Sequence, residues 1–249
     1  MEILTLLLAF VIAFGTMFVG AISGGVGLVL RPLLIFLGFP VLAVIGSVRV
    51  ASVIGEIPGI FLLHKHKRVD WKLVRILVIP MFLGSLIAGI SVLSILKEVL
   101  NLTIGVILLI LGVVLATQKK IWMKTHSSYD SSKARHVTGF FGTMIVSFFN
   151  TIIGGLGPMF SSLYIFNYKK SYIDASALGK TTSYIGTGIA SIVFIMGKAV
   201  DWKLFGVLIL GFALGSFLGV HHGLKKGERW IRTLVLIVVF ASAIKLIFF

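Results

Sequence analysis

The sequence predicts an all-α, polytopic membrane protein built from two related halves. The chain is very apolar: 58% of its 249 residues are hydrophobic and 12% are charged, and the mean hydropathy is +1.10, which few soluble domains reach. Apolar segments that approach the ~20 residues needed to cross a bilayer lie at residues 3–22, 73–93, 99–117, 137–153, 204–220 and 231–249. A pentapeptide and a glycine cluster recur at a nearly fixed spacing, which predicts a duplication.

The repeated segments define this duplication. Val-Asp-Trp-Lys-Leu begins at Val69 and again at Val200, and a Gly-Ser pair follows each copy at the same distance. We call the sequence separation between Val69 and Val200 the repeat spacing. Gly24-Gly25-Val26-Gly27 is matched by Gly154-Gly155-Leu156-Gly157 at a spacing shorter by one. In so apolar a chain, duplicated halves are typical of transporters, whose site lies where the copies meet. We therefore expect an N-terminal transmembrane repeat (residues 1–117), a basic cytoplasmic linker (118–136) and a C-terminal transmembrane repeat (137–249).

Composition excludes several classes of function. The chain has no cysteine, so disulfides, thiolate chemistry and cysteine metal sites are absent, and we expect no cofactor. The first apolar segment lacks a basic start and a small-residue cleavage site, so it is interpreted as a retained helix. The net charge of +15 is attributed to cytoplasmic loops and anionic lipid rather than to nucleic acid.

The basic loops predict how the halves are oriented. The linker and the loop at residues 64–68 are both strongly basic, which places them in the cytoplasm. The basic loops of the second half, at residues 169–170 and 225–229, are not at the equivalent positions, as expected for inverted repeats. Inversion requires the short segments 28–38 and 158–167 to cross; if they are re-entrant hairpins, the repeats are parallel. We favour inverted repeats, each with about four long helices plus a short broken helix or re-entrant segment.

The glycine clusters predict unwound bends at membrane depth. Each cluster precedes a proline, Pro32 or Pro158, and glycine allows positive φ while proline ends a helix. Non-helical backbone is tolerated there only beside protein or a water-filled cavity, and a helix that begins at such a bend favours an anion. Close helix packing through Gly20 and Gly24 is the alternative. The cavity interpretation makes these glycines substrate-binding residues: Gly24, Gly25, Gly27, Gly154, Gly155 and Gly157.

Charged residues within apolar segments are further site candidates, since each costs ~2.5–3.5 kcal/mol to insert. Arg49 and Lys180 are separated by the repeat spacing. A pseudo-two-fold axis would bring both cations to one small oxyanion, which a guanidinium can bind through two oxygens. Snorkelling to the interface is the alternative. The polar patches around the two cations add Ser47, Ser52, Thr181 and Thr182 as substrate-binding candidates.

The other charges have weaker assignments. Glu56, two turns after Arg49, either carries a coupling proton or balances the charge of Arg49. Arg31 is either a functional residue, as a charge within an apolar segment is by default, or a marker of the membrane edge. Asp174 is interpreted as a helix N-cap. The Asp-Trp pairs that begin at Asp70 and Asp201 are interpreted as N-caps with interfacial tryptophans rather than as substrate contacts.

The pattern resembles the TauE/SafE sulfite exporter family of membrane transporters. The resemblance rests on the glycine-rich turn at residues 20–27 with Pro32, on Val69-Asp70-Trp71, and on their second-half partners at residues 154–158 and 200–202. It covers nearly the whole chain. It implies export or uptake of small anions such as sulfite, sulfonates and related organosulfur acids, without ATP hydrolysis.

Other classes of function find little support. The chain carries no HExxH motif, no P-loop and no plausible catalytic pair at membrane depth, so an enzyme is not expected. We expect a secondary anion transporter working by alternating access between the repeats, with a channel-like or scaffold subunit, for another small carboxylate or for no substrate, as the alternative. The expected partners are a small anion, the lipid bilayer and a second copy in a homodimer. The expected location is the plasma membrane, of the bacterial inner-membrane type.

Overall fold

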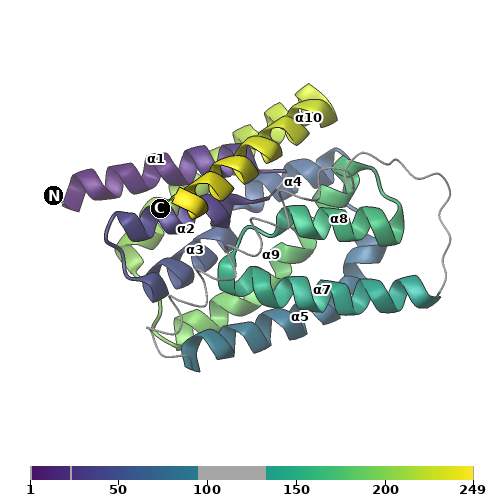
Figure 1. The fold of residues 1–249 in the computed structure, drawn as a ribbon, viewed down its shortest axis with the longest axis horizontal. Helices are drawn as coiled ribbons and strands as arrows, with labels where there is room; N and C mark the ends of the chain where they lie inside the picture. Colours follow the sequence, from purple (N-terminus) through teal and green to yellow (C-terminus); the bar gives the residue numbers. More distant parts are fainter. Residues whose placement is uncertain (1, 23, 95–132, 249) are drawn as a thin grey trace.

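The structure, a computed structural model, describes residues 2–22, 24–94 and 133–248, with side chains for residues 3–22, 24–94 and 135–226. All regular secondary structure in these residues is helical, which confirms the all-α prediction for the described part of the chain (Figure 1). The predicted segment 99–117 and linker residues 118–132 lie outside it. The helices are α1 (Glu2–Gly20), α2 (Val26–Phe36), α3 (Val41–Gly55), α4 (Ile57–Lys65), α5 (Trp71–Ser94), α7 (Lys133–Ile153), α8 (Gly157–Tyr168), α9 (Tyr172–Met196) and α10 (Trp202–Phe248).

Five stretches of the described chain are long and apolar enough to cross a membrane. They are Ile3–Gly20, Val41–Lys65, Trp71–Ser94, Arg135–Ile153 and Trp202–Lys226. The second of these joins α3 and α4 into one span. The two segments expected to be short are the helices α2 and α8, of 11 and 12 residues, which rise only about 16–18 Å. These lengths and compositions make the chain a multi-pass membrane protein.

The C-terminal part differs from the sequence expectation. Segments 204–220 and 231–249 are predicted as separate helices with a basic loop between them, but α10 is helical from Trp202 to Phe248, including residues 225–232. A straight helix of 47 residues would extend about 70 Å. In Figure 1 the yellow C-terminal part of α10 instead folds back toward the end of the molecule where the chain begins. The reversal is therefore made within helical residues.

The aspartates of the two repeated pentapeptides cap the helices that follow them. The Oδ1 atoms of Asp70 and Asp201 each accept backbone N–H groups from the second and third following residues, at 2.9–3.2 Å. Such bonds satisfy donors that a helix start leaves unpaired. Trp71 and Trp202 are 44% and 59% exposed, as expected for tryptophans at a membrane interface. The N-cap prediction is confirmed for both aspartates.

The same prediction is wrong for Asp174. The N-cap of α9 is Ser171, whose hydroxyl accepts the backbone N–H of Asp174 at 3.2 Å and donates to its carboxylate at 2.7 Å. Asp174 thus occupies the third helical position, where its backbone N–H and its carboxylate both bond the hydroxyl of the N-cap. Its other carboxylate oxygen lies 3.4 Å from Arg68, so the residue links the start of α9 to the loop before α5.

Helices at equivalent positions of the two halves begin one repeat spacing apart: α2 and α8, α3 and α9, α5 and α10. One of these pairs is central: α3 and its continuation α4 lie alongside α9 and run antiparallel to it. Three contacts show the direction: Arg49 with Thr187, Val53 with Tyr184, and Glu56 with Lys180. Residue numbers therefore rise along one helix as they fall along the other.

The two capping aspartates therefore lie at opposite ends of α9. Where α9 begins, the carboxylate of Asp70 is 2.7 Å from Lys170. Where α9 ends, the backbone of Asp201 exchanges hydrogen bonds with the hydroxyl of Ser47 at 2.9 and 3.1 Å. The 25 residues of α9 span about 37 Å. We call the Asp70 side the basic end, because the loops 64–68 and 169–170 lie there.

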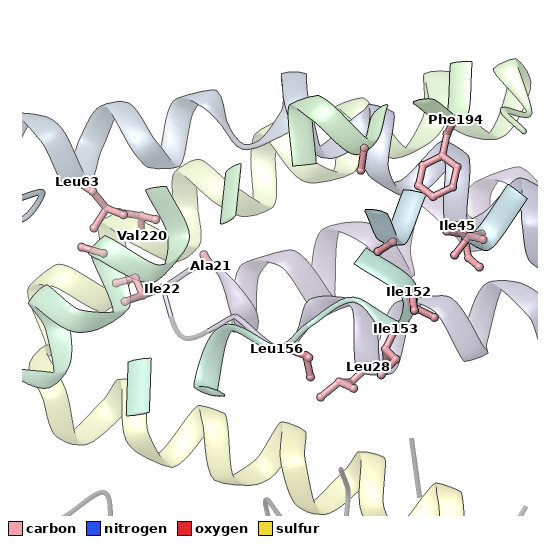
Figure 2. Close-up of a cluster of buried hydrophobic side chains, with 14 of the residues drawn as sticks. Ala21, Ile22, Leu28, Ile45, Leu63, Ile152, Ile153, Leu156, Phe194 and Val220 are labelled. Atoms are coloured by element: carbon pink, nitrogen blue, oxygen red, sulfur yellow. The ribbon is translucent and has the colours of Figure 1, made fainter. Parts of the chain in front are cut away.

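The outer helices pack against the other half. α1 lies along α10 and α5 along α7, and glycines at 211, 215 and 219 let α10 approach the α1 backbone. An apolar cluster lies around the places where α1 and α7 end. Figure 2 shows Leu28 of α2 close to Ile153 and Leu156 of the second half. The core of the molecule thus lies where the two halves meet.

Candidate functional site

Two unwound glycine turns form the centre of the molecule. α1 ends at Gly20 and α2 begins at Val26, while α7 ends at Ile153 and α8 begins at Gly157. Positive φ values of 76–88° occur in both turns, at Gly24, Gly25, Gly154 and Gly155, a conformation that favours glycine. The predicted unwound bends are therefore confirmed.

The turns also pack directly on each other. A Cβ atom at Gly24 would overlap the backbone of Gly157, and one at Gly27 would overlap the backbone of Gly154. Gly155 is equally close to Gly25. The glycines are needed for this contact as well as for the turn conformation.

A cavity of about 80 Å³ adjoins the turns. A buried water needs about 10–15 Å³ of such volume, so the cavity has room for several waters or a small ion. Its lining combines both glycine turns with polar residues of α3 and α9. The lining residues are Met17, Gly20, Ile22, Gly24, Gly25, Val26, Gly27, Arg31, Val48, Arg49, Ser52, Glu56, Asn150, Gly154, Gly155, Gly157, Ser176, Lys180, Ser183 and Thr187.

Helical spacing explains how α3 and α9 contribute. On α9, Ser176, Lys180, Ser183 and Thr187 follow one another at intervals of four, three and four residues, which places them on one face. Arg49, Ser52 and Glu56 form the corresponding stripe on α3 and at the junction with α4. The antiparallel pair thus turns two polar stripes toward one cavity.

The two cations make equivalent contacts across the halves. Lys180 Nζ lies 2.8 Å from the carboxylate of Glu56, and Arg49 Nη1 donates to the hydroxyl of Thr187 at 3.0 Å. Glu56 and Thr187 are themselves separated by the repeat spacing, so each cation contacts the same relative position of the other half. That position is acidic in one half and neutral in the other. Glu56 therefore pairs with Lys180, whereas Arg49 contacts a neutral group.

Arg31, which the sequence leaves open between a functional position and the membrane edge, lies in the same cavity. It is 5% exposed, and its Nη1 donates to the carbonyl of Ile152 at 2.6 Å. Its guanidinium packs against Gly154 in the opposite glycine turn. A position one turn after the first bend is the signal that could have identified it.

Three guanidinium nitrogens in this region lack partners. Nε and Nη2 of Arg49 and Nε of Arg31 are buried without a hydrogen bond to any described residue. Neither arginine takes part in an ion pair within the described residues. Buried N–H groups are normally satisfied, and an unpaired buried charge is costly. Such donors favour an anion or ordered water in the cavity.

Not every residue of the predicted site lines the cavity. Arg49, Lys180, Ser52, Glu56 and the six predicted glycines do. Ser47 instead bonds the backbone of Asp201. Thr181 and Thr182 donate to backbone carbonyls one turn back, at Ala177 and Leu178, and lie on other faces of α9.

Four polar lining residues are not among the predicted site residues: Asn150, Ser176, Ser183 and Thr187. Ser183 lies one repeat spacing after Ser52, and Thr187 one repeat spacing after Glu56, so the duplication could have found both. Asn150 accepts the backbone N–H of Leu156 at 3.0 Å, which ties down the second glycine turn. No sequence pattern singles out this last role.

Comparison with known proteins identifies the family of the chain. The family described as "Sulfite exporter TauE/SafE" matches residues 8–246. The chain is 24% identical to a "Probable membrane transporter protein" of Haemophilus influenzae, covering 98% of this chain and 94% of that protein. It is 27% identical to "Probable membrane transporter protein YjnA" of Bacillus subtilis, covering 93% and 96%. No solved structure matches it significantly. The chain belongs to the TauE/SafE family of membrane transporters.

Proposed function

We propose that the protein is a secondary transporter of small anions, such as sulfite, a sulfonate or a related organosulfur acid, with the cavity between its halves as the substrate site. The observation that supports this proposal most strongly is the charge of the cavity. Arg31, Arg49 and Lys180 line it with one carboxylate, Glu56, which leaves a net charge of +2. Charges at membrane depth are costly and mark substrate pathways.

The donors in the cavity suit an oxyanion. Nε and Nη2 of Arg49, unpaired and buried, can bind two oxygens of a sulfur oxyanion in the fork geometry of guanidinium. The starts of α2 and α8 line the same cavity, and helix starts carry partial positive charge. Ser52 and Ser183 add hydroxyl groups.

The movement we propose is alternating access between two inverted repeats, residues 1–117 and 137–249, joined by the linker 118–136. The antiparallel pairing of α3 and α4 with α9 supports inversion. The location of Asp70 and Asp201 at opposite ends of α9 supports it as well. Two inverted repeats can exchange conformations and open a central site to either side in turn.

The basic end is assigned to the cytoplasm of a bacterial plasma membrane. The loops at residues 64–68 and 169–170 and the start of α7 carry basic side chains there, and His136 at that start packs against Tyr168. Short cytoplasmic loops are enriched in lysine and arginine, and the relatives named above come from bacteria.

Flux measurements test this function. Purified protein in liposomes should take up radiolabelled sulfite, thiosulfate or methanesulfonate, and Arg49→Gln should reduce that flux by about 10- to 100-fold, the worth of a charge-assisted hydrogen bond or two. Arg68→Gln is the matched control, because Arg68 is exposed at the basic end, outside the cavity. Undiminished flux in both Arg49→Gln and Lys180→Gln would remove the site assignment.

A further inference from the structure

Glu56 is the one acidic residue among the described residues that line the cavity. It lies at the junction of α3 and α4, where its carboxylate contacts Lys180 at 2.8 Å, and the two side chains are only 19% and 8% exposed. A carboxylate beside an anion site opposes the anion by charge repulsion. Its presence in an otherwise cationic cavity therefore calls for a reason beyond binding.

Among the residues that the structure describes, the surroundings of Glu56 contain cations and a hydroxyl but no second acid. Arg31 from α2, Arg49 from α3 and Lys180 from α9 line the same cavity. The hydroxyl of Tyr184 on α9 donates to the carbonyl of Val53, three residues before Glu56. α10 packs against this junction through Phe212 and Ser216, and residues 206–220 contain no titratable side chain.

An anion in the cavity would compete with Glu56 for Lys180. Arg49, whose contact in the other half is the neutral Thr187, has no carboxylate within ion-pair distance among the described residues. Lys180 becomes available to the anion only if it leaves Glu56. A carboxylate that loses its partner in a buried site and gains a negative neighbour is strongly disfavoured. Neutralisation by a proton removes both penalties.

We propose that Glu56 is the proton-coupling residue of the transporter, taking up one proton each time Lys180 passes from its carboxylate to the bound anion. This proposal rests on the proposed function. The proton comes from the solvent and forms an O–H bond on the Glu56 carboxylate; Lys180 keeps its charge throughout, and no other covalent bond changes. Release of the anion reverses both steps, so the anion and a proton cross together in the same direction.

The position of the acid in only one half fits this role. Thr187, the counterpart of Glu56 in the second half, cannot take up a proton at ordinary pH. The cavity therefore has one negative charge that a proton can neutralise, on Glu56, and one cation, Arg49, that lacks a paired carboxylate within the described residues and stays available to an anion. Acids at both equivalent positions would pair with both central cations and leave no cation for the anion. With an acid at neither position, anion binding would not be coupled to protons.

Calorimetry on purified protein tests the coupling. Thiosulfate and methanesulfonate are suitable probes because neither titrates near neutral pH. Binding enthalpies measured in buffers of different ionisation enthalpy give the protons taken up per anion. Wild type should take up about one, and its affinity should rise as pH falls, by at most about tenfold per pH unit. Glu56→Gln should still bind the probe, with no proton uptake and with pH-independent affinity.

Asp174→Asn is the matched control, since Asp174 is the carboxylate of another ion pair between the halves, exposed and outside the cavity; it should keep the proton uptake of wild type. The proposal is overturned if Glu56→Gln takes up protons as wild type does, or if wild type binds a probe without proton uptake. In either case probe binding that depends on Arg49 leaves the anion site standing. If wild type binds neither probe, the proposed function fails and the coupling fails with it.

Discussion

The Arg49 side and the Lys180 side of the cavity occupy equivalent positions of the two halves, yet the cations on the two sides have different partners. Both cations contact the same relative position of the other half, but Lys180 meets the carboxylate of Glu56 and Arg49 meets the hydroxyl of Thr187. The backbone features around them, two glycine turns with positive φ, are alike. The comparison teaches that equivalent backbone builds the cavity, whereas one unequal residue pair, Glu56 and Thr187, decides which cation has a carboxylate partner.

The largest effect should come from the feature that the halves share. Alanine at Gly24 or Gly155 faces both a positive φ and the backbone of the opposite turn, so each should cost about 2–6 kcal/mol of unfolding free energy. Gly38→Ala is the control, because Gly38 has a positive φ but open space around it. SDS titration in mixed micelles measures the differences. A loss at Gly38 as large as at the other two would show that strain, not contact between the turns, dominates.

The next largest effect should be a difference in stability between variants of the two cations. Lys180→Gln leaves the carboxylate of Glu56 without its partner and should destabilise the protein by about 1–3 kcal/mol. Glu56→Gln in the same chain should restore most of this loss. Arg49→Gln should destabilise the protein less, because it leaves only the hydroxyl of Thr187 without its hydrogen-bond partner. The same denaturation assay checks all three variants, and equal losses for the two single cation variants would break the comparison.

Supplying the missing acid should make the halves alike. Thr187→Glu places a carboxylate beside Arg49, which should then pair internally and bind anions about tenfold more weakly. Thr187→Gln is the matched variant of similar size without the charge. Thiosulfate affinity, measured by calorimetry, is the readout. Equal affinities in the two variants would mean that the charge of Arg49 does not hold the anion.

The smallest effect concerns the ends of α9. Burial alone raises the pKa of Asp70, but hydrogen bonds from Lys170 and from the backbone of Leu73 and Lys72 outweigh it and lower the pKa below its usual value. A lowered pKa stabilises the fold above the unfolded-state value, and this contribution is lost as pH falls through the folded-state value. Asp70→Asn should therefore cost up to about 1 kcal/mol at neutral pH and nothing in acid.

Asp201→Asn tests whether this cost comes from the ion pair. Asp201 caps its helix as Asp70 does, but no ion pair of it is found in the described part of the chain. The neutral-pH cost should therefore be smaller than that of Asp70→Asn. Thermal unfolding at neutral and acid pH measures both variants, and a cost of Asp70→Asn that persists in acid would contradict the account.

Sequence alone predicts what local chemistry decides. The glycine turns and the aspartate caps follow from backbone preferences, and the repeat spacing selects Arg49 and Lys180. It does not predict Arg31, because its burial depends on the glycine turn of the other half. Nor does it predict that Thr182 lies away from the cavity, since the rotation of α9 about its axis is set by tertiary packing. Asn150 escapes for a similar reason, because its partner is a backbone group.

The central claim is that Arg49 holds a small anion in the cavity between α3 and α9. A structure determined with 2-bromoethanesulfonate tests it most directly, because anomalous scattering locates the bromine and the adjoining density locates the sulfonate. The account predicts sulfonate oxygens within hydrogen-bond distance of Nε and Nη2 of Arg49, the donors that lack partners, and no such density in Arg49→Gln. A sulfonate bound elsewhere, with Arg49 untouched, would contradict it.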